Sequence, residues 1–343
     1  MIIKKNISDS VAVLTLNRAE SLNALSTEMI LSLKSHLTDL EKDKSIIAIV
    51  INSCLQKAFC AGGDIVDVCK DIRDKKITKA NKFFRQEYDM HILLRTIKTP
   101  VIGIAEGFSI GGGLGLLNSC KYKIISESSQ ASMPEALIGF FPDVGASNFL
   151  SSSKFGLFLG LTSQRIKASD MLLCKLADYF IPSKDIDKLF KFLSTADSLN
   201  FTELLNQKLK LLDKRDILED GNLIKNKNFI TEVCKAKCIK DFDKKLNSYS
   251  GDSAWILKAI ENFNYGSKHS LKFIFEQLKQ NRNWDLKKLF DKEYKMALYF
   301  SEHNDLLEGV RALLEDKDKA PVWKDSLYNS VDIPNDILKE LNS

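Results

Sequence analysis

The sequence has few of the residues that cross-link secreted proteins or hold metal ions. It contains seven cysteines, an odd number, with no CxxC pair. No histidine lies within ligand spacing of a cysteine or of another histidine, and the four are His36, His91, His269 and His303. We therefore expect free thiols, a reducing compartment and no metal site.

Long apolar runs are also missing. No segment reaches the ~20 apolar residues that span a bilayer, and the amino terminus has no apolar stretch of signal-peptide length. We expect an intracellular protein that does not enter a membrane, in a bacterial cytoplasm or, if the source is eukaryotic, in an organelle matrix with no obvious targeting segment in this chain.

Charge of neither sign dominates. The 343 residues include 50 Lys and Arg and 45 Asp and Glu, a net charge of +5, and the basic residues are dispersed. Nucleic-acid binding is therefore not favoured. A hydrophobic fraction of 44% is typical of a globular protein with a full core.

The hydrophobic pattern changes along the chain. Up to about residue 180, short β-branched runs alternate with amphipathic stretches, which favours a layered α/β fold. We expect a helix at 27–42 with Ser26 as its N-cap, and strands at 11–17, 46–52, 101–105, 122–125 and 131–133. From about 184 the pattern is helical, so the predicted domains are an α/β core at 1–183 and a mainly helical region at 184–343 packed on it.

Two glycine-rich turns follow expected strands. The first is Lys57–Asp64 (KAFCAGGD), and the second is Glu106–Leu116 (EGFSIGGGLGL). Glycines before a helix can aim backbone N–H groups at one point, where they stabilise an anionic oxygen. The alternatives are an ordinary turn ended by a helix-capping Asp64, and glycines that only permit close packing. A dinucleotide fingerprint does not fit, because position 116 is Leu.

The second turn also contains G-x-S-x-G, from Gly107 through Ser109 to Gly111. A serine nucleophile elbow requires this strand-to-helix context. However, no HGGG-type loop precedes it, and the downstream His269 and His303 lie in the helical region without an acidic partner motif. Catalysis by Ser109 is therefore disfavoured.

Two carboxylates stand in an apolar segment, Met133–Gly145 (MPEALIGFFPDVG). Glu135 and Asp143 each follow a proline. Apolar surroundings favour the neutral form of a carboxyl group, which suits an acid or base that works near neutral pH. The alternative is a pair of carboxylates that cap helices.

These segments, in this order and after LNRAESLNALS at 16–26, resemble the crotonase (enoyl-CoA hydratase/isomerase) superfamily. Within it, FFRQEY at 83–88, FFPDVG and a late segment from Glu308 to Trp323 resemble the 3-hydroxyisobutyryl-CoA hydrolases. The resemblance implies a crotonase-like spiral of ββα units with a helical C-terminal region.

It also implies roles for five residues. The N–H groups of Gly63 and Gly112 would form the oxyanion hole for a thioester carbonyl, Glu135 and Asp143 would be catalytic, and Glu87 would contact substrate. Hydratases carry a second glutamate where this chain has Gly115, which disfavours hydration.

The implied reaction is hydrolysis of a short branched 3-hydroxyacyl-CoA, 3-hydroxyisobutyryl-CoA in valine catabolism. The partner is the acyl-CoA substrate, and no cofactor is needed because coenzyme A is part of that substrate. A homo-oligomer is left open. The alternatives are an enoyl-CoA hydratase/isomerase of the same fold and a non-catalytic CoA-binding protein. Basic residues between Lys70 and Lys98 are left unassigned as contacts for the CoA phosphates.

Overall fold

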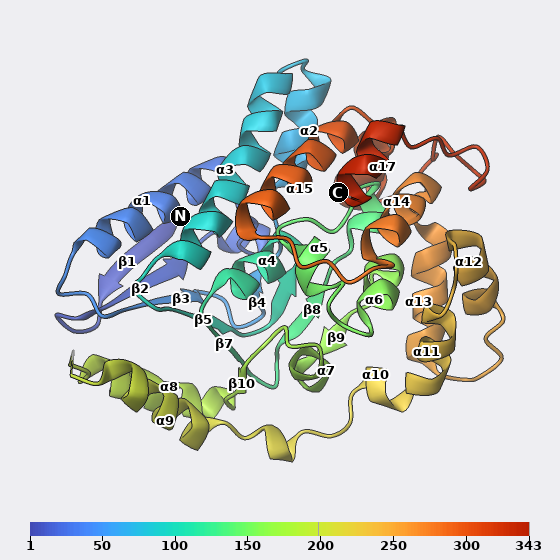
Figure 1. Ribbon diagram of the computed structural model, residues 1–343. Helices are drawn as coiled ribbons and strands as arrows, with labels where there is room; N and C mark the ends of the chain where they lie inside the picture. The colour runs from blue at the N-terminus through green and yellow to red at the C-terminus, as the bar shows by residue number, and fades with distance from the viewer. Residues whose placement is uncertain (198, 343) are drawn as a thin grey trace. The chain divides into compact units, whose positions relative to one another are not determined.

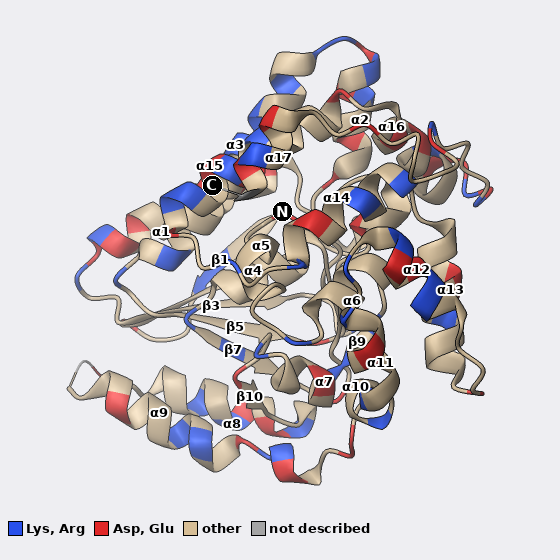
Figure 2. Cartoon of the chain, turned by 45° about the vertical axis from the view of Figure 1, so that its right-hand side comes forward, with Lys and Arg blue, Asp and Glu red and all other residues tan. Residues whose placement is uncertain are grey.

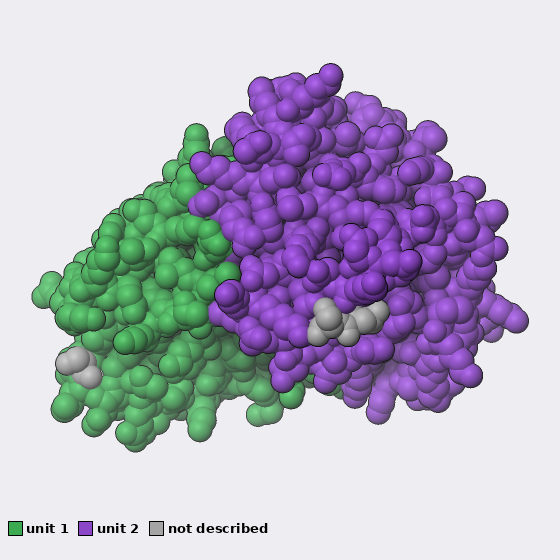
Figure 3. All heavy atoms as spheres, turned by 45° about the horizontal axis from the view of Figure 1, so that its top comes forward, with its two compact units in different colours: residues 1–63, 89–131, 166–221 green, residues 64–88, 132–165, 222–343 purple. Residues whose placement is uncertain are grey.

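The computed structural model describes residues 1–197 and 199–342. The chain forms two compact units, each built from three segments (Figure 3). Unit 1 contains Met1–Gly63, Asp89–Ala131 and Ile166–Gly221, and unit 2 contains Asp64–Tyr88, Ser132–Arg165 and Asn222–Ser343. These units are interleaved along the chain, and the predicted domains at 1–183 and 184–343 stay a prediction.

Unit 1 is organised around a six-stranded sheet (Figure 1). The edge strand pairs antiparallel with its neighbour, and every other pairing is parallel. The strand order is β1 (Ile2–Asn6), β2 (Val11–Leu16), β3 (Ala48–Ser53), β5 (Val101–Ala105), β7 (Tyr122–Ile125) and β10 (Tyr179–Phe180). The strands β2, β3 and β5 are almost wholly buried, as expected for parallel strands covered on both faces.

Helices pack on this sheet. The side chains of α8 and α9, among them Leu189 and Leu205, join Val50, Ile102 and Ile124 in one core cluster. The helices of unit 1 are α1 (Thr27–Lys42), α4 (Gly112–Ser119), α7 (Ala168–Leu173), α8 (Ser183–Ser194) and α9 (Phe201–Leu212), with the 3-10 turns η1 (Ala19–Ser21) and η3 (Arg215–Ile217).

The expected helix at 27–42 is confirmed together with its cap. The Met29 N–H donates to Ser26 Oγ at 3.2 Å, which satisfies one of the free donors at the start of α1. The expected strands at 101–105 and 122–125 also have the bounds that the sequence predicts, and the other three are shifted by one or two residues at their ends.

A second, four-stranded sheet has the order β4 (Ala58–Cys60), β6 (Phe108–Ile110), β8 (Gln130–Ser132) and β9 (Ile166–Lys167). The strands β4 and β6 are parallel. Parallel neighbours end at the same edge of a sheet, so the two glycine turns that follow β4 and β6 leave this sheet side by side.

Unit 2 is mostly helical. Its elements are α2 (Ile65–Arg73), η2 (Glu135–Ile138), α5 (Ala146–Phe149), α6 (Gly156–Thr162), α10 (Asn222–Lys225), α11 (Lys227–Cys234), α12 (Ile239–Asn247), α13 (Ala254–Tyr265), α14 (Lys268–Leu278), α15 (Leu286–Ser301), α16 (Asn304–Val310), the π turn η4 (Arg311–Glu315) and α17 (Asn335–Asn342). The long α3 (Ile77–Thr96) continues into unit 1. The expected helical character of the C-terminal region is confirmed.

Charges of both signs alternate on the outer helices, as α8, α12 and α13 show (Figure 2). Within the described residues, no helix is both long enough and apolar enough to cross a membrane.

Candidate active site

Among the buried carboxyl groups of unit 2, four form a cluster in which each of the other three interacts electrostatically with Asp143. Three are those singled out in the sequence: Glu87 on α3, Glu135 at the start of η2 and Asp143 in the loop before α5. The fourth is Glu293 on α15. The residues are 3%, 6%, 6% and 0% exposed in that order. Carboxyl groups are rarely buried unless a partner or a function requires it.

Not every oxygen of these carboxyl groups has a hydrogen-bond partner. The Tyr88 hydroxyl donates to Asp143 Oδ2 at 2.6 Å. By contrast, Glu87 Oε1 and Glu135 Oε2 are buried and accept no hydrogen bond within the described structure. Leaving a polar atom buried and unpaired is costly, so these two oxygens are candidates for contact with a substrate.

Burial shifts the pKa of every member of the cluster upward. Desolvation raises the pKa of Glu135 well above its usual value, and the nearby Asp143 charge adds to the shift. The same two causes act on the pKa of Glu87. Burial raises the pKa of Asp143 to about 7, against the opposing hydrogen bond from Tyr88. The pKa of Glu293 is raised to about 8, again mainly by burial.

No basic side chain in the described part of the chain forms an ion pair with these groups. Among the salt bridges of residues 1–197 and 199–342, none involves a member of the cluster. A carboxyl group with a pKa near 7 and no fixed counter-ion can gain or lose a proton at physiological pH. Such a group is suited to general acid or base catalysis.

Sequence reasoning missed Glu293. The sequence predicts an apolar face of this long helix from Leu286, Leu289, Phe290, Ala297 and Phe300, and all of these except the half-buried Leu286 are buried. Glu293 lies four residues after Leu289 and four before Ala297, so it belongs to the same face. A carboxyl residue at an apolar position of a helix was therefore the available signal.

The two glycine turns lie in unit 1. The Gly62 carbonyl accepts from the Leu25 N–H at 2.7 Å, and in a trans peptide the next N–H points the opposite way. The Gly63 N–H is thus directed away from Leu25. In the second turn, the Gly111 carbonyl accepts from the Gly115 N–H at 3.0 Å, so the Gly112 N–H points out of the start of α4.

The two turns are also close together. A Cβ atom on Gly62 would be 3.1 Å from the Ile110 carbonyl oxygen and 3.5 Å from the Gly112 nitrogen. Gly62 has φ of +107°, which favours glycine, and Gly111 has φ of +50°. Both N–H groups therefore come from neighbouring turns, as an oxyanion hole requires. The alternative reading of Asp64 is also correct, since it caps α2 by accepting from the Asp67 N–H at 3.5 Å.

Ser109 is fully buried in β6. Its hydroxyl has no hydrogen-bond partner within the described residues, so no base is in position to activate it. The structure gives no support to a serine nucleophile.

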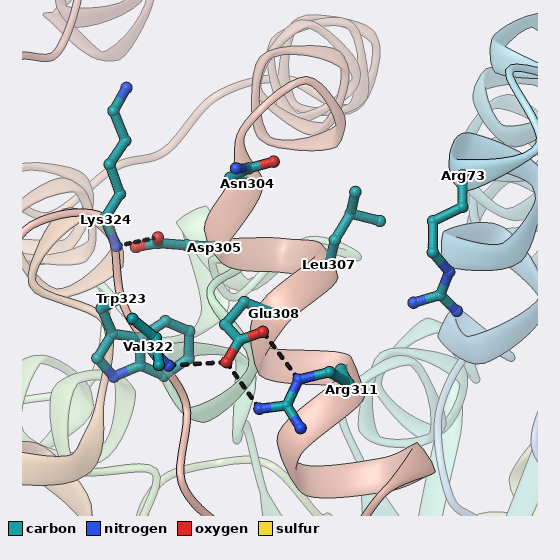
Figure 4. A pocket seen from close by; sticks show the side chains of 9 residues that line it. All are labelled: Arg73, Asn304, Asp305, Leu307, Glu308, Arg311, Val322, Trp323 and Lys324. Carbon is teal, nitrogen blue, oxygen red and sulfur yellow. Dashed lines mark hydrogen bonds and ion pairs between the residues drawn. The ribbon is translucent and has the colours of Figure 1, made fainter.

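The late motif lines part of an open pocket of about 630 Å³ in unit 2 (Figure 4). Arg311 forms a two-point ion pair with Glu308, at 2.9 and 2.8 Å, and the Val322 N–H donates to the same carboxylate at 2.7 Å. Residues of the motif are thus held together by an ion pair and a hydrogen bond. The pocket is lined by Arg73, Asn304, Asp305, Leu307, Glu308, Arg311, Val322, Trp323 and Lys324.

Arg73, one of the basic residues left unassigned, forms an ion pair with Glu315. Its charge is therefore already compensated within unit 2. Nothing in the structure singles out a phosphate-binding residue in the range Lys70–Lys98.

The chain matches the protein family described as "Enoyl-CoA hydratase/isomerase" over residues 11–337. It is 32% identical over 327 residues to a Gallus gallus protein named "3-hydroxyisobutyryl-CoA hydrolase, mitochondrial", covering 93% of this chain and 83% of that one. A Dictyostelium discoideum protein of the same name is 30% identical over 340 residues, covering 96% and 89%.

The fold has solved counterparts. The crystal structure of an enoyl-CoA hydratase from Rhodobacter sphaeroides 2.4.1 superposes with a TM-score of 0.86 at 26% identity, covering 99% of this chain and 96% of the other. The predicted fold class, α/β with a crotonase-like core and a helical C-terminal region, is confirmed, and so is the resemblance on which it rested.

Proposed function

Because the chain belongs to the enoyl-CoA hydratase/isomerase family, we propose that it hydrolyses a short branched 3-hydroxyacyl-CoA thioester, with 3-hydroxyisobutyryl-CoA as the favoured substrate. The names of its relatives support this substrate. The observation that carries the proposal is Glu135, a buried carboxyl group with one oxygen unpartnered and an upward-shifted pKa.

Glu135 is the proposed catalytic group. Its carboxylate either attacks the thioester carbonyl, to give an anhydride that water then opens, or removes a proton from the attacking water. In both routes the bond between the acyl carbon and sulfur breaks, the oxygen of water joins the acyl carbon, and the sulfur of coenzyme A takes a proton. Both routes require Glu135 to be ionised when the reaction begins.

The N–H groups of Gly63 and Gly112 are the proposed oxyanion hole. They stabilise the negative charge that develops on the carbonyl oxygen, and one such donor typically contributes ~10²–10³ in rate. Because these donors are backbone groups, the contribution depends on the conformation of the two turns.

Asp143 and Glu87 are the proposed anchors for the 3-hydroxyl group. Tyr88 occupies Asp143 Oδ2, and Glu87 Oε1 is unpartnered. A substrate hydroxyl that donates to these carboxyl groups would satisfy buried acceptors. A plain acyl-CoA would leave them unpaired, which is the physical basis for discrimination.

The test is a panel of acyl-CoA thioesters that differ only in the 3-hydroxyl group. We expect release of free coenzyme A and of a free hydroxy acid, with faster turnover of the hydroxylated substrates. Glu135→Gln is expected to lower kcat by ~10²–10⁴, while Ser109→Ala keeps near-normal turnover. Substrate binding without any turnover by the wild type would instead support a non-catalytic CoA-binding protein.

The likeness to an enoyl-CoA hydratase structure favours a second candidate, hydration or isomerisation by the same fold. Hydration by two carboxylates would need a glutamate at the position of Gly115, which this chain lacks. Mass spectrometry of the products separates the two, because a hydratase yields a thioester 18 mass units heavier and an isomerase a thioester of unchanged mass.

Other parts of the proposal follow from the reaction. No cofactor is required beyond the coenzyme A of the substrate, and neither a metal ion nor nucleic acid takes part. A bacterial cytoplasm or an organelle matrix is the proposed location. A homo-oligomer is compatible with the proposed reaction.

A further inference from the structure

The loop that carries Asp143 has a strained backbone. Val144 has φ of +51° and Gly145 has φ of +96°. Positive φ suits glycine but is a rare conformation for a β-branched residue, because its Cβ substituents crowd the backbone. Such a conformation persists only where surrounding groups hold it.

Two buried side chains hold this loop. Glu293 Oε2 accepts from the Gly145 N–H at 2.7 Å, and Glu293 Oε1 accepts from the Ser147 N–H at 3.1 Å. On α14, Gln277 Nε2 donates to the Pro142 carbonyl at 2.7 Å and to Ser147 Oγ at 2.8 Å. Glu293 and Gln277 are both fully buried. The backbone on each side of Asp143 is therefore fixed from a different helix.

The side chain of Asp143 is fixed from a third helix. Tyr88, on α3, donates to one carboxylate oxygen, and its ring packs against Phe290 at 5.7 Å between centroids. Phe290 and Glu293 are on the same face of α15. The helix that holds the loop thus also supports the residue that orients the carboxylate.

We propose that Glu293 is a positioning residue that fixes the place at which Asp143 meets the 3-hydroxyl group of the substrate, and thereby sets selectivity for hydroxylated acyl groups. This inference rests on the proposed function, in which Asp143 anchors that hydroxyl. Glu293 acts through the backbone at Gly145 and Ser147 and does not itself contact substrate.

The carboxyl group at position 293 has a physical reason. Burying an ionisable group is costly, and an apolar residue would suit this face of α15 better. A carboxyl group can receive both N–H donors at once, because each of its oxygens keeps acceptor capacity whether the group is ionised or protonated. Glutamine would keep one acceptor and turn an NH₂ group toward the other donor, so one of the two attachments would be lost.

Glu293→Gln is the first variant. We expect the ratio of kcat/KM for a 3-hydroxyacyl-CoA to that for the plain acyl-CoA of equal length to fall by ~10–10²-fold, because small misplacements of a catalytic contact have effects of this size. The plain substrate, which never used the Asp143 anchor, is expected to change much less. The control is Glu302→Gln, the same change at the exposed end of α15, with an unchanged ratio.

Gln277→Leu is the second variant, and it decides the matter if Glu293→Gln does not fold. It removes the other attachment of the same loop, because the Pro142 carbonyl and Ser147 Oγ lose this donor. We expect the same loss of selectivity. In both variants the Gly145 and Ser147 amides are expected to exchange with solvent faster than in the wild type, as read by NMR.

The outcomes separate the inference from the proposed function. If the wild type does not discriminate by the hydroxyl group, the role of Asp143 is wrong and both ideas fall. If the wild type discriminates and folded Glu293→Gln and Gln277→Leu proteins keep that ratio, only the role of Glu293 is overturned. An equal loss for both substrates would also overturn it, since it would indicate a merely structural residue.

Discussion

Asp143 is subject to two opposite influences. Its burial raises its pKa, and the hydrogen bond from Tyr88 lowers it, with a result of about 7. The Tyr88 hydroxyl favours the ionised form because it donates a hydrogen bond to the charged carboxylate. The Tyr88 hydroxyl, together with a backbone hydrogen bond, thus keeps the pKa of Asp143 in the range where it exchanges protons at physiological pH.

Tyr88→Phe is expected to raise the pKa of Asp143, because it removes the side-chain donor that stabilises the charged carboxylate. The measurement is the pH dependence of kcat/KM for a 3-hydroxyacyl-CoA, whose Asp143-dependent limb moves to higher pH. Tyr294→Phe is the matched control, since this ring also contacts Tyr88 but makes no hydrogen bond to Asp143. A profile that does not move in Tyr88→Phe would contradict the assignment.

The raised pKa of Glu135 leads to a second prediction about the pH dependence of activity. The proposed mechanism needs its ionised form, and burial together with the Asp143 charge raises its pKa well above that of an ordinary glutamate. We therefore expect kcat/KM to fall on acidification while the pH is still well above 4.5. Activity that stays constant down to pH 5 would rule out a raised-pKa carboxylate as the catalytic group.

The strands β4 and β6 and the helix α4 form the element that presents the Gly63 and Gly112 N–H groups. The first turn of α4 lies directly on β4, where a Cβ atom on Gly113 would overlap the carbonyl oxygen of Cys60. Position 113 therefore requires glycine, because a side chain there would prevent α4 from packing this closely on β4. The third glycine of the run is therefore a packing residue, while its neighbour Gly112 offers the N–H.

Gly113→Ala is expected to lower the free energy of unfolding by ~1–3 kcal/mol, the usual cost of overpacking, and to lower kcat by displacing α4 from β4. Urea unfolding and turnover are the measurements. Gly266→Ala is the control, because the nearest atoms to an added Cβ there are 3.4 Å away. Equal stability of the two variants would show that α4 can move away without cost.

At the scale of the whole molecule, the buried carboxyl groups make stability depend on pH. In the unfolded chain they are ionised above about pH 4–5. In the folded protein Asp143 and Glu293 keep their protons up to about 7 and 8. Between these limits the folded state binds more protons than the unfolded state, so stability decreases as the pH rises.

Histidines act in the opposite direction at lower pH. Burial lowers the pKa of His91 and His269 to about 3, so folding becomes less favourable as the pH falls below the unfolded value of about 6.5. Above about 6.5 these histidines are neutral in both states. The carboxyl groups then determine the slope.

The free energy of unfolding, measured by urea titration, is therefore expected to decrease from pH 6.5 to 8. Glu293→Gln is expected to make this decrease shallower, because one of the titrating groups is removed. A free energy that stays constant over this interval would show that the cluster is already ionised at pH 6.5.

Local sequence determined much of this protein, because its signals lie within short segments. The Ser26 cap, the apolar strands and the two glycine turns each depend on residues close together in the chain, and so do the proline-flanked Glu135 and Asp143. The order of these segments also identified the family. Each of these inferences could be made without knowing which residues far apart in the sequence are in contact.

Only the tertiary structure decided the rest. Glu293 contacts Gly145 across 148 positions of sequence, and no local pattern states that its helix holds that loop. The fold buries the carboxyl cluster and so raises the pKa of its members. It also gives the Ser109 hydroxyl no hydrogen-bond partner within the described residues, and it brings Arg73 to Glu315. A pKa and a hydrogen bond depend on which groups surround an atom in space, and the folded chain alone brings those groups together.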